Sequence, residues 1–352
     1  MIVYLFVFSI SIFFAFLAER RRKNDMIYFL YLIVIVFLNS FIAGARNDNI
    51  GTDISFYAYR VFHTDLEDAE IDLTIVLLAK FVHLFSDTFG VFLFLIEAWI
   101  MGFACYAATL MRKKLSIVLF ISFFCLMAYN QSLNIMRQSM AMSVMMCMLA
   151  YLMRKEYIKV VAFMVVAYFC HSTSVIGLLF IIAYYCVQQF GIKKTFLFVL
   201  FMGGILVVSF NILFYNLISI ALSNNLLASQ YERYAVGDYG ETSKTAILIC
   251  IMYIIPFLII LKNKPKVENF LTIFALVMSL ALAYCSLGGE IVSRIRLYFT
   301  YVNILFFSIS LYRERKCVTW LVLVIAVFNF VISIWISNYG ETVPYHSKYL
   351  EI

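Results

Sequence analysis

Charged residues are scarce in this sequence. Asp, Glu, Lys and Arg together make up 13% of the 352 residues, whereas hydrophobic residues make up 64%. A soluble domain carries about a quarter charged residues, so this chain could not cover itself with a polar surface. Proline is also rare, with three residues, and no long polar linker interrupts the chain. These absences exclude a soluble globular protein and favour one whose solvent is the lipid bilayer.

Paired cysteines and clustered histidines are also absent. The eight cysteines lie inside or at the ends of apolar stretches, and none of them forms a CxxC pair. No cysteine and histidine cluster has metal-site spacing, and no two of the four histidines have ligand spacing. We therefore expect the cysteines to be packing residues. The sequence predicts no metal and no cofactor.

Long apolar runs are abundant. Runs such as Leu271–Ala283 and Val318–Ile336 do not alternate with polar residues, which argues against the strands of a membrane β-barrel. A spanning helix needs roughly 20 mostly apolar residues. The sequence therefore predicts an all-α polytopic membrane protein with about twelve transmembrane helices, near 1–18, 26–43, 89–111, 115–132, 138–153, 157–172, 174–190, 195–215, 244–261, 268–287, 297–312 and 317–336.

The net charge of +7 comes largely from six short basic clusters. Two apolar runs fit between almost every neighbouring pair of clusters, so the positive-inside rule places all six in the cytoplasm and both termini outside. Met1–Leu17 is not a signal peptide, because its basic residues follow the apolar run. We expect one integral-membrane domain over 1–352 and no nucleic-acid partner. The clusters are Arg20–Lys23, Arg112–Lys114, Arg154 with Lys155 and Lys159, Lys193–Lys194, Lys262 with Lys264 and Lys266, and Arg313 with Arg315 and Lys316.

The stretch Ile71–Phe85 does not fit this alternation. It is short for a crossing, it contains Lys80 and His83, and counting it as a span would invert the rest of the topology. We therefore expect 71–85 to be an interfacial helix on the outer side, with a short span as the alternative. The larger outer loops are then 44–72 and 215–242, followed by a shorter one at Leu287–Leu297.

The basic residues outside the cytoplasmic clusters are mostly arginines. Arginine presents a planar fork that matches phosphate oxygens, whereas lysine suffices for lipid headgroups. This bias favours a phosphate or pyrophosphate ligand on the outer face. The arginines are Arg46, Arg60, Arg137, Arg233, Arg294 and Arg296.

Arg137 is the sharpest candidate among these arginines. Asn134, Arg137 and Gln138 follow the spacing of one helical face at the start of a helix. A helix N-terminus favours anions through its free N–H groups and its dipole. We therefore expect Arg137 to bind pyrophosphate and its two neighbours to contact substrate. The alternative is an interfacial arginine that reaches toward lipid headgroups.

His171 ends a predicted span and could take a proton from an attacking sugar hydroxyl. The alternative is a histidine hydrogen-bonded to a neighbouring helix. Asp53, which follows Gly51 and Thr52, is a second candidate base or a sugar-orienting group. Tyr57 and Arg60 follow Asp53 as candidate substrate contacts. The acidic run Asp65–Asp72 is interpreted as a solvated loop face.

Arg294 and Arg296 flank the start of a late span. At a spacing of two they do not share a helix face, and Arg294 is favoured, with Glu290 as its ion-pair partner. Tyr298 follows them as a candidate substrate contact.

Taken in order, these motifs resemble the EpsG family of Wzy-type polysaccharide polymerases. The resemblance rests on Arg46 with Gly51-Thr52-Asp53 and Tyr57, on Arg137-Gln138 with Ala141, on Phe169-Cys-His171-Ser172, and on Arg294 with Tyr298. It implies a GT-C-like, metal-independent glycosyltransferase in the bacterial cytoplasmic membrane, with its site facing the exterior. The expected donor is a growing glycan on undecaprenyl pyrophosphate and the acceptor a lipid-linked repeat unit, with a chain-length regulator as a further partner.

Two other classes remain open. A flippase or transporter of lipid-linked oligosaccharide would need polar residues along a path at mid-bilayer depth, and the spans contain few. A membrane-bound O-acyltransferase could also use His171, but it would need a constellation for the acyl donor on the cytoplasmic side. The residues favour the polymerase over both.

Overall fold

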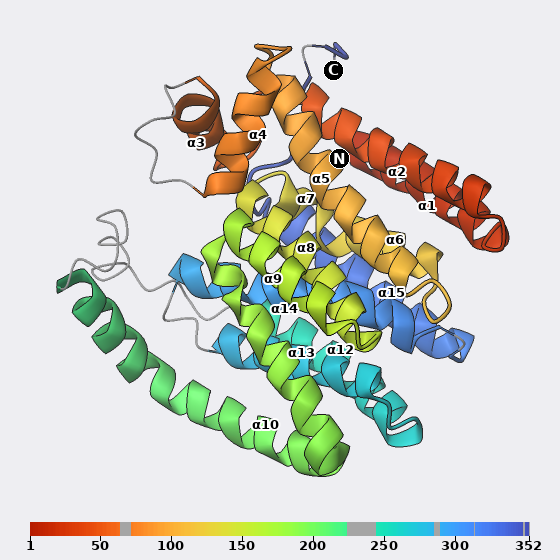
Figure 1. Cartoon of the computed structure of the whole chain (residues 1–352), viewed down its shortest axis with the longest axis vertical. Coiled ribbons are helices and arrows are strands. Elements are labelled where there is room, and N and C mark those ends of the chain that lie inside the picture. Colours follow the sequence, from red (N-terminus) through yellow and green to blue (C-terminus); the bar gives the residue numbers. More distant parts are fainter. Residues whose placement is uncertain (64–71, 224–243, 285–288, 313, 348, 352) are drawn as a thin grey trace. The chain divides into compact units, whose positions relative to one another are not determined.

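Helices make up the regular structure of the described residues. The computed structural model describes residues 1–63, 72–223, 244–284, 289–312, 314–347 and 349–351, and gives the backbone alone for 206–223 and 289–291. The chain divides into two compact units (Figure 1). Unit 1 contains Met1–Leu178 and Phe307–Ile352, and unit 2 contains Leu179–Phe306.

Unit 1 is a bundle in which neighbouring helices pack in a continuous series. The helix α9 packs on α8, α8 on α5, α5 on α2, α2 on α1, α1 on α6, and α6 on α15. The bounds are α1 (Ile2–Arg20), α2 (Asp25–Ala45), α3 (Ile54–Phe56), the π-helical turn η1 (Tyr57–Phe62), α4 (Leu73–His83), α5 (Phe89–Leu110), α6 (Ile117–Met127), α7 (Tyr129–Ser132), α8 (Met136–Met153), α9 (Tyr157–Cys170), the 3₁₀ turn η3 (Ser172–Ile176), α15 (Lys316–Phe330) and the π-helical turn η6 (Val331–Ile336).

Close packing of α2 on α5 depends on two glycines. A Cβ atom on Gly44 would lie 2.7 Å from the carbonyl oxygen of Gly90, and one on Gly90 would lie 2.6 Å from the carbonyl oxygen of Gly44. Small residues let two membrane helices approach at backbone distance. The pair therefore sets where α2 meets the start of α5, just before the Asn47–Asp53 loop.

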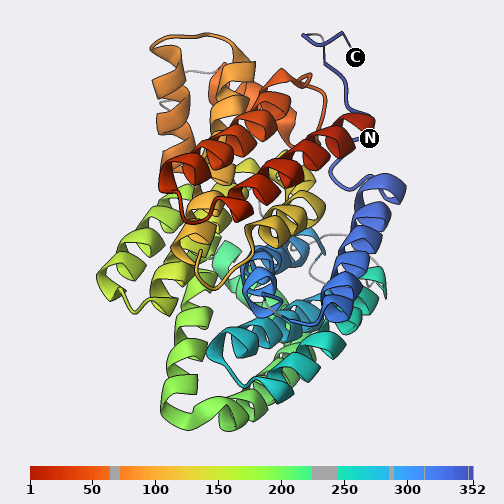
Figure 2. The ribbon, with the colours of Figure 1, turned by 90° about the vertical axis from the view of Figure 1, so that its right-hand side faces the viewer.

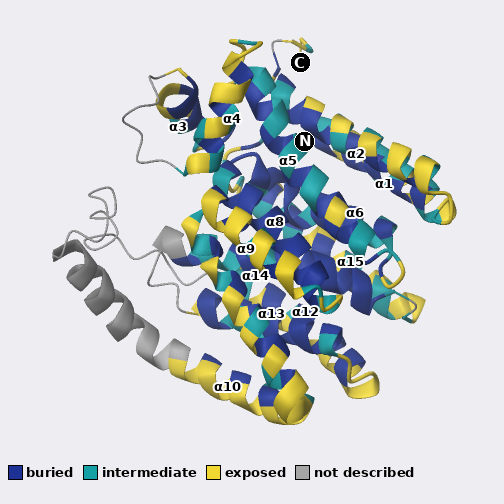
Figure 3. Cartoon of the chain, viewed as in Figure 1, coloured by how far each residue is buried: buried dark blue, intermediate teal, exposed yellow. Residues whose placement is uncertain are grey.

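The helix α8 is the centre of unit 1. Its residues are buried along almost the whole length, including the polar Ser139 and Ser143, whereas α1 and α2 expose one face each (Figure 3). A helix buried on all sides belongs to the interior of a bundle. Arg137 is the half-buried exception at its first turn. The central helix therefore presents its charged start at one end of unit 1.

Three basic loops of unit 1 meet at the opposite end of α8. Arg112 forms an ion pair with Asp25, with 2.7 Å between Nη2 and Oδ1. Arg154 donates a hydrogen bond to the Leu110 carbonyl at 3.3 Å, and Arg22 donates to the Leu115 carbonyl. The chain between these clusters therefore returns to the same end each time, as the positive-inside interpretation requires.

The short helix α4 corresponds to the uncertain stretch 71–85. With 11 residues it is about 16 Å long, roughly half of a hydrocarbon core. It packs against α5, α9 and η1, and His83 Nε2 lies 2.9 Å from the Phe62 carbonyl oxygen. Asp25 precedes α4 in the sequence and Arg112 follows it, and the two side chains form an ion pair, so the chain has returned to the same end of unit 1 by Arg112. Its interfacial position stays a prediction.

Unit 2 contains most of α10 (Gly177–Ser223), α12 (Lys244–Asn263), α13 (Val267–Tyr284) and most of α14 (Gly289–Ser310). The helix α12 packs on α13, and the Phe180 ring contacts Phe274 at 5.3 Å and Phe299 at 5.5 Å. Gly191, with φ +76°, breaks α10 into two helical parts (Figure 1). The break lies between the two spans predicted at 174–190 and 195–215.

A helix occupies each range where a span was predicted. Within the described residues, seven helical segments are long and apolar enough to cross a membrane, and the prediction of a polytopic helical membrane protein is confirmed to that extent. They are Ile2–Arg20, Asp25–Ala45, Phe89–Leu110, Ser172–Ile205, Lys244–Asn263, Val267–Tyr284 and Lys316–Ile336. The number twelve and the outward termini stay predictions. The predicted loop 215–242 lies mostly outside the described residues, and its first part, to Ser223, is helical.

The two ends of the chain lie together in unit 1 (Figure 2). The Tyr4 hydroxyl donates to the Thr342 carbonyl at 2.9 Å, and the Tyr345 hydroxyl donates to the Ile42 carbonyl at 3.0 Å. The C-terminal segment after η6 therefore packs on the ends of α1 and α2, beside the Asn47–Asp53 loop.

Candidate functional site

Asn134 connects the loop after α2 to the start of α8. Its Oδ1 accepts hydrogen bonds from the Thr52 hydroxyl at 3.0 Å and from the Asp53 backbone N–H at 2.8 Å. Asn134 lies two residues before α8 begins, and Ile135 has a non-helical backbone. The predicted common helical face of Asn134, Arg137 and Gln138 is therefore wrong, because the helix starts after Asn134.

Two glycines allow the loop and the C-terminal segment to close on Asn134. Gly51 has φ +108° and Gly340 has φ +80°, a region that residues with a Cβ rarely adopt. A Cβ on Gly51 would lie 3.3 Å from Asn134 Oδ1, and one on Gly340 would lie 3.3 Å from Asn134 Nδ2. The two backbones can therefore pack against both sides of this amide.

The C-terminal segment holds the Gly51–Asp53 turn through backbone hydrogen bonds. The Gly51 N–H donates to the Glu341 carbonyl at 3.1 Å and the Thr52 N–H donates to the Gly340 carbonyl at 3.2 Å. Gly340 and Glu341 were not predicted to have a role. The only local signal was the turn-forming pair Asn338 and Gly340.

Arg137 is held by a carboxylate and two aromatic rings. Its Nη1 lies 2.9 Å from Asp72 Oδ2, and its guanidinium carbon lies 5.2 Å from the Phe56 ring centre and 6.0 Å from that of Tyr57. Its backbone N–H donates to the Tyr57 hydroxyl at 3.3 Å. The Arg137 side chain is 23% exposed and that of Asp72 is 19% exposed. The guanidinium is therefore oriented while one side stays accessible.

Asp72 was interpreted as part of a solvated loop face, and for this residue the interpretation is wrong. It occupies the N-cap position of α4, but its carboxylate bonds Arg137 and makes no cap hydrogen bond. Burial raises the pKa of the Asp72 carboxyl above its ordinary value, and this effect exceeds the opposite influence of Arg137. Burial therefore disfavours the charged form of Asp72. Residues 65–71 of the same run lie outside the described residues.

His171 lies at the junction of α9 and η3. Its Nδ1 accepts a hydrogen bond from the Thr173 N–H at 3.3 Å and lies 2.9 Å from the Thr173 hydroxyl. The turn that follows His171 thus helps to orient the ring. The preceding Cys170 lies beside Thr74 and Asp72. The His171 end of α9 therefore adjoins the start of α4, which carries the Arg137 partner.

The arrangement in unit 1 combines an oriented arginine, a competing carboxylate and a half-buried histidine at neighbouring helix ends. A family model, described as the EpsG family, matches residues 28–347, nearly the whole chain. The chain belongs to the EpsG family. This is a Wzy-type polymerase-like family, associated with glycosyltransferase-like polymerase activity and polysaccharide biosynthesis. No curated protein and no solved structure matches the chain.

The other predicted site residues on the loop after α2, on η1 and on α8 differ in how far their side chains are exposed in this EpsG protein. Asp53 is half-buried, Tyr57 and Gln138 are buried, and Arg60 is exposed on η1. Tyr57 contacts Arg137 through its hydroxyl and ring. The structure thus brings Thr52, Asp53 and Tyr57 to the start of α8, and it leaves Arg60 on the surface.

Arg46 lies inside the EpsG bundle, 3% exposed, at the end of α2. Its Nη2 contacts Met136 Sδ at 3.7 Å, and Tyr4, Tyr129 and Glu97 are among the groups near enough to influence it electrostatically. Burial lowers the pKa of Arg46 below its ordinary value. Ser132 donates a hydrogen bond to Glu97 Oε2 at 2.9 Å. A pyrophosphate role for Arg46 stays a prediction.

Glu97 was not predicted from the sequence, although its position within an apolar run pointed to it. It is the one acidic residue within the apolar run 89–111, and ionisable residues inside spans are functional candidates by default. Phe56 and Thr173 were also missed, and no local pattern pointed to them.

The C-terminal EpsG candidates belong to unit 2. Arg294 and Arg296 are half-buried on α14, and Tyr298 is fully buried. Arg296 lies beside Cys250 of α12. The side chain of Glu290 and the whole of Arg233 fall outside the described residues. Their grouping with Arg137 in one site stays a prediction.

Metal ligands were not expected in this chain. Within the described ranges, no group of three His, Cys, Asp or Glu side chains is placed to hold a metal ion. Metal independence itself stays a prediction.

Proposed function

We propose that this EpsG protein polymerises a polysaccharide by transferring a growing glycan from undecaprenyl pyrophosphate to a lipid-linked repeat unit on the extracytoplasmic side of the membrane. The observation that carries the proposal is Arg137, oriented by Asp72, Phe56 and Tyr57 at the start of the central helix. A pyrophosphate leaving group needs fixed cations where its charge develops.

The transfer follows from the chemistry of the donor. An acceptor sugar hydroxyl attacks the anomeric carbon of the donor sugar, and a new carbon–oxygen bond forms. The bond from that carbon to the pyrophosphate breaks, and undecaprenyl pyrophosphate leaves with the electron pair. The hydroxyl proton passes to a base, for which His171 and then Asp53 are proposed. Arg137 stabilises the departing pyrophosphate, aided by the N–H groups of the first turn of α8.

Asp72 gives Arg137 a defined resting partner. A pyrophosphate that binds the guanidinium must displace the Asp72 carboxylate or share Arg137 with it. Because burial disfavours the charged form of Asp72, the resting ion pair is weaker than its 2.9 Å distance alone suggests. We infer that Asp72 holds Arg137 in place but binds it weakly enough for a pyrophosphate to replace it.

The test is the set of lipid-linked glycans in cells that lack the gene and carry variants of it. Arg137→Lys keeps the charge but loses the bidentate fork. We expect it to lower polymer formation by at least about tenfold, the scale of one lost charge-assisted hydrogen bond. Single repeat units on the carrier should accumulate. Arg21→Lys, an exposed arginine between α1 and α2, is the matched control.

Three outcomes separate the candidate functions, with membrane levels of each variant matched to wild type. Accumulated single units with Arg137→Lys and long polymer with Arg21→Lys support the polymerase. Normal polymer from both Arg137→Lys and Arg137→Ala contradicts the proposed role of Arg137. Polymer of normal length that lacks acyl groups would instead indicate an O-acyltransferase.

A further inference from the structure

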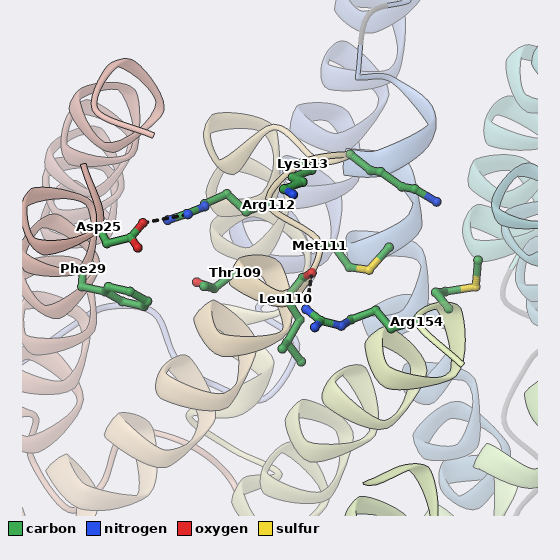
Figure 4. Close-up of a pocket in the computed structure, with 10 residues that line it drawn as sticks. Asp25, Phe29, Thr109, Leu110, Met111, Arg112, Lys113 and Arg154 are labelled. Atoms are coloured by element: carbon green, nitrogen blue, oxygen red, sulfur yellow. Dashed lines mark hydrogen bonds and ion pairs between the residues drawn. The ribbon is translucent and has the colours of Figure 1, made fainter. Parts of the chain in front are cut away.

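A cavity lies at the end of unit 1 opposite to Arg137. It has a volume of about 440 Å³ and is formed by the start of α2, the end of α5 with the loop that follows it, and the end of α8. Four of its lining side chains are cationic and one is acidic (Figure 4). They are Arg112, Lys113, Lys114 and Arg154, with Asp25 as the acid.

Two arginines of this cavity are held in place by the protein. Arg112 forms its 2.7 Å ion pair with Asp25 and lies 4.9 Å over the Tyr28 ring. Arg154 donates to Glu156 at 2.6 Å, and it donates to the Leu110 carbonyl at 3.3 Å (Figure 4). Lys113 and Lys114 are exposed beside them. The cavity therefore combines two oriented guanidinium groups with two exposed lysines, a donor set suited to phosphate oxygens.

An apolar stripe starts at the same cavity. Phe29 lines the cavity. Every fourth position of α2 from Phe29 onward is apolar and these positions share one face, namely Phe29, Ile33, Phe37 and Phe41. All four are exposed, by 43% to 63%. From Phe29 to Phe41 the stripe runs about 18 Å along the helix, which covers one leaflet of a hydrocarbon core about 30 Å thick.

We propose that this cavity binds the phosphate headgroup of an anionic membrane phospholipid, whose acyl chain lies along the Phe29–Phe41 stripe of α2. A soluble phosphate compound would use the cations but not the stripe, and a neutral lipid would use the stripe but not the cations. The basic clusters place this end in the cytoplasm by the positive-inside rule, where the leaflet carries anionic headgroups. The proposal does not depend on the polymerase chemistry proposed above.

The test is lipid retention by the purified full chain, measured by native mass spectrometry after delipidation. The protein is titrated with phosphatidylglycerol, cardiolipin or phosphatidylcholine in detergent. We expect saturable retention of one anionic phospholipid and none of phosphatidylcholine at the same concentration. Lys113→Gln with Lys114→Gln should weaken retention at least about tenfold. Arg21→Gln with Lys23→Gln removes the same charge from exposed positions of the neighbouring loop and should change it less than about twofold.

Two further arms identify the occupant. Phe29→Ala should weaken phospholipid retention, whereas Phe13→Ala, which alters an exposed phenylalanine on α1, should not. Inorganic phosphate at the concentration of the lipid should fail to compete. Equal loss in the two double variants, equal retention of phosphatidylcholine, or effective competition by inorganic phosphate would each overturn the proposal. Because the readout is bound lipid, its failure leaves the test of polymerase function unaffected.

Discussion

Arg137 and Asp72 form an ion pair whose strength depends on pH. Burial raises the pKa of Asp72, so this carboxyl takes up a proton at a higher pH than an ordinary aspartate does. Above that pKa, Asp72 is charged and competes with a pyrophosphate for Arg137. Below it, Asp72 is neutral and the guanidinium is more readily available, while the doubly esterified pyrophosphate of the donor keeps its charge. If Arg137 binds pyrophosphate as proposed, a residue outside the predicted site therefore influences how Arg137 exchanges partners.

We expect donor affinity to fall as pH rises through the raised pKa of Asp72. Asp72→Asn removes the competing charge, so donor binding should be tighter above that pKa and nearly independent of pH. The measurement is binding of a labelled lipid-linked donor to detergent-purified protein from the ordinary aspartate pKa upward. Asp87→Asn, which removes a carboxylate that is 95% exposed beside His83, should retain the wild-type profile. An unchanged profile in Asp72→Asn would show that Asp72 does not compete.

His171 is expected to act on turnover and not on donor binding. His171→Ala should reduce the polymerisation rate by about 10²–10⁴, the usual worth of a general base, with donor affinity retained. Thr173→Val removes the hydroxyl 2.9 Å from Nδ1 and should cause a smaller loss through ring orientation. Single-turnover rates and donor binding, measured on the same preparations, separate the two effects. Full activity of His171→Ala would make Asp53 the next base to test.

At the scale of elements, the C-terminal segment after η6 determines the conformation of the Gly51–Asp53 turn. It contributes the Gly340 and Glu341 carbonyls that accept from Thr52 and Gly51, and it packs on Asn134. None of these contacts belongs to a helix. The C-terminal segment therefore contacts both the Gly51–Asp53 turn and Asn134, just before the start of the central helix α8. It lies almost 300 residues after that turn in the chain.

We expect Gly340→Ala to destabilise this junction. Alanine at φ +80° costs about 1–2 kcal/mol in the backbone, and its Cβ would lie 3.3 Å from Asn134 Nδ2. Thermal unfolding in detergent should begin at a lower temperature, and polymerisation should fall. Gly191→Ala shares the positive φ but meets no atom within 4 Å, so it should lower stability without this loss of activity. Gly102→Ala, inside α5 and also without a neighbour within 4 Å, should be neutral or stabilising.

At the scale of the whole molecule, basic loops and candidate catalytic residues lie at opposite ends of unit 1. The ion pair of Arg112 with Asp25 and the hydrogen bond from Arg154 to Leu110 bring three loops together. Asp72, Arg137 and the C-terminal segment lie at the far end of α8 from them. This polarity is what an enzyme with cytoplasmic basic loops and an extracytoplasmic site requires.

Topology mapping should place these two ends on opposite sides of the membrane. Single-cysteine labels at the exposed Lys114 and Lys155 should report the cytoplasm. Labels at the exposed Asp48 and Tyr349 should report the exterior. Tyr349 is a better labelling position than Ser347, because Ser347 is buried and donates a hydrogen bond to the Ala45 carbonyl. Labelling of Lys114 and Asp48 from the same side would contradict this arrangement.

The sequence by itself determined that this protein is helical and embedded in a membrane, because both properties follow from local composition. Apolar runs of spanning length exclude a water-exposed surface, and their lack of alternation excludes strands. The basic clusters and the position of Arg137 at a helix start were also readable, since each depends on a few adjacent residues. The family followed from short motifs in a fixed order, which a single sequence displays.

Only the tertiary structure decided what Arg137 and Arg46 contact. Asp72 is 65 residues from Arg137, Met136 is 90 residues from Arg46, and Gly340 is more than 200 residues from Asn134. No periodicity relates such positions, so their contacts arise from how the helices pack. The same packing buries Arg46, which sequence analysis had placed on the outer face, and starts α8 after Asn134. Burial and partner choice depend on residues far apart in the chain, whereas helix formation depends on near neighbours, and this difference separates what could be predicted from what could not.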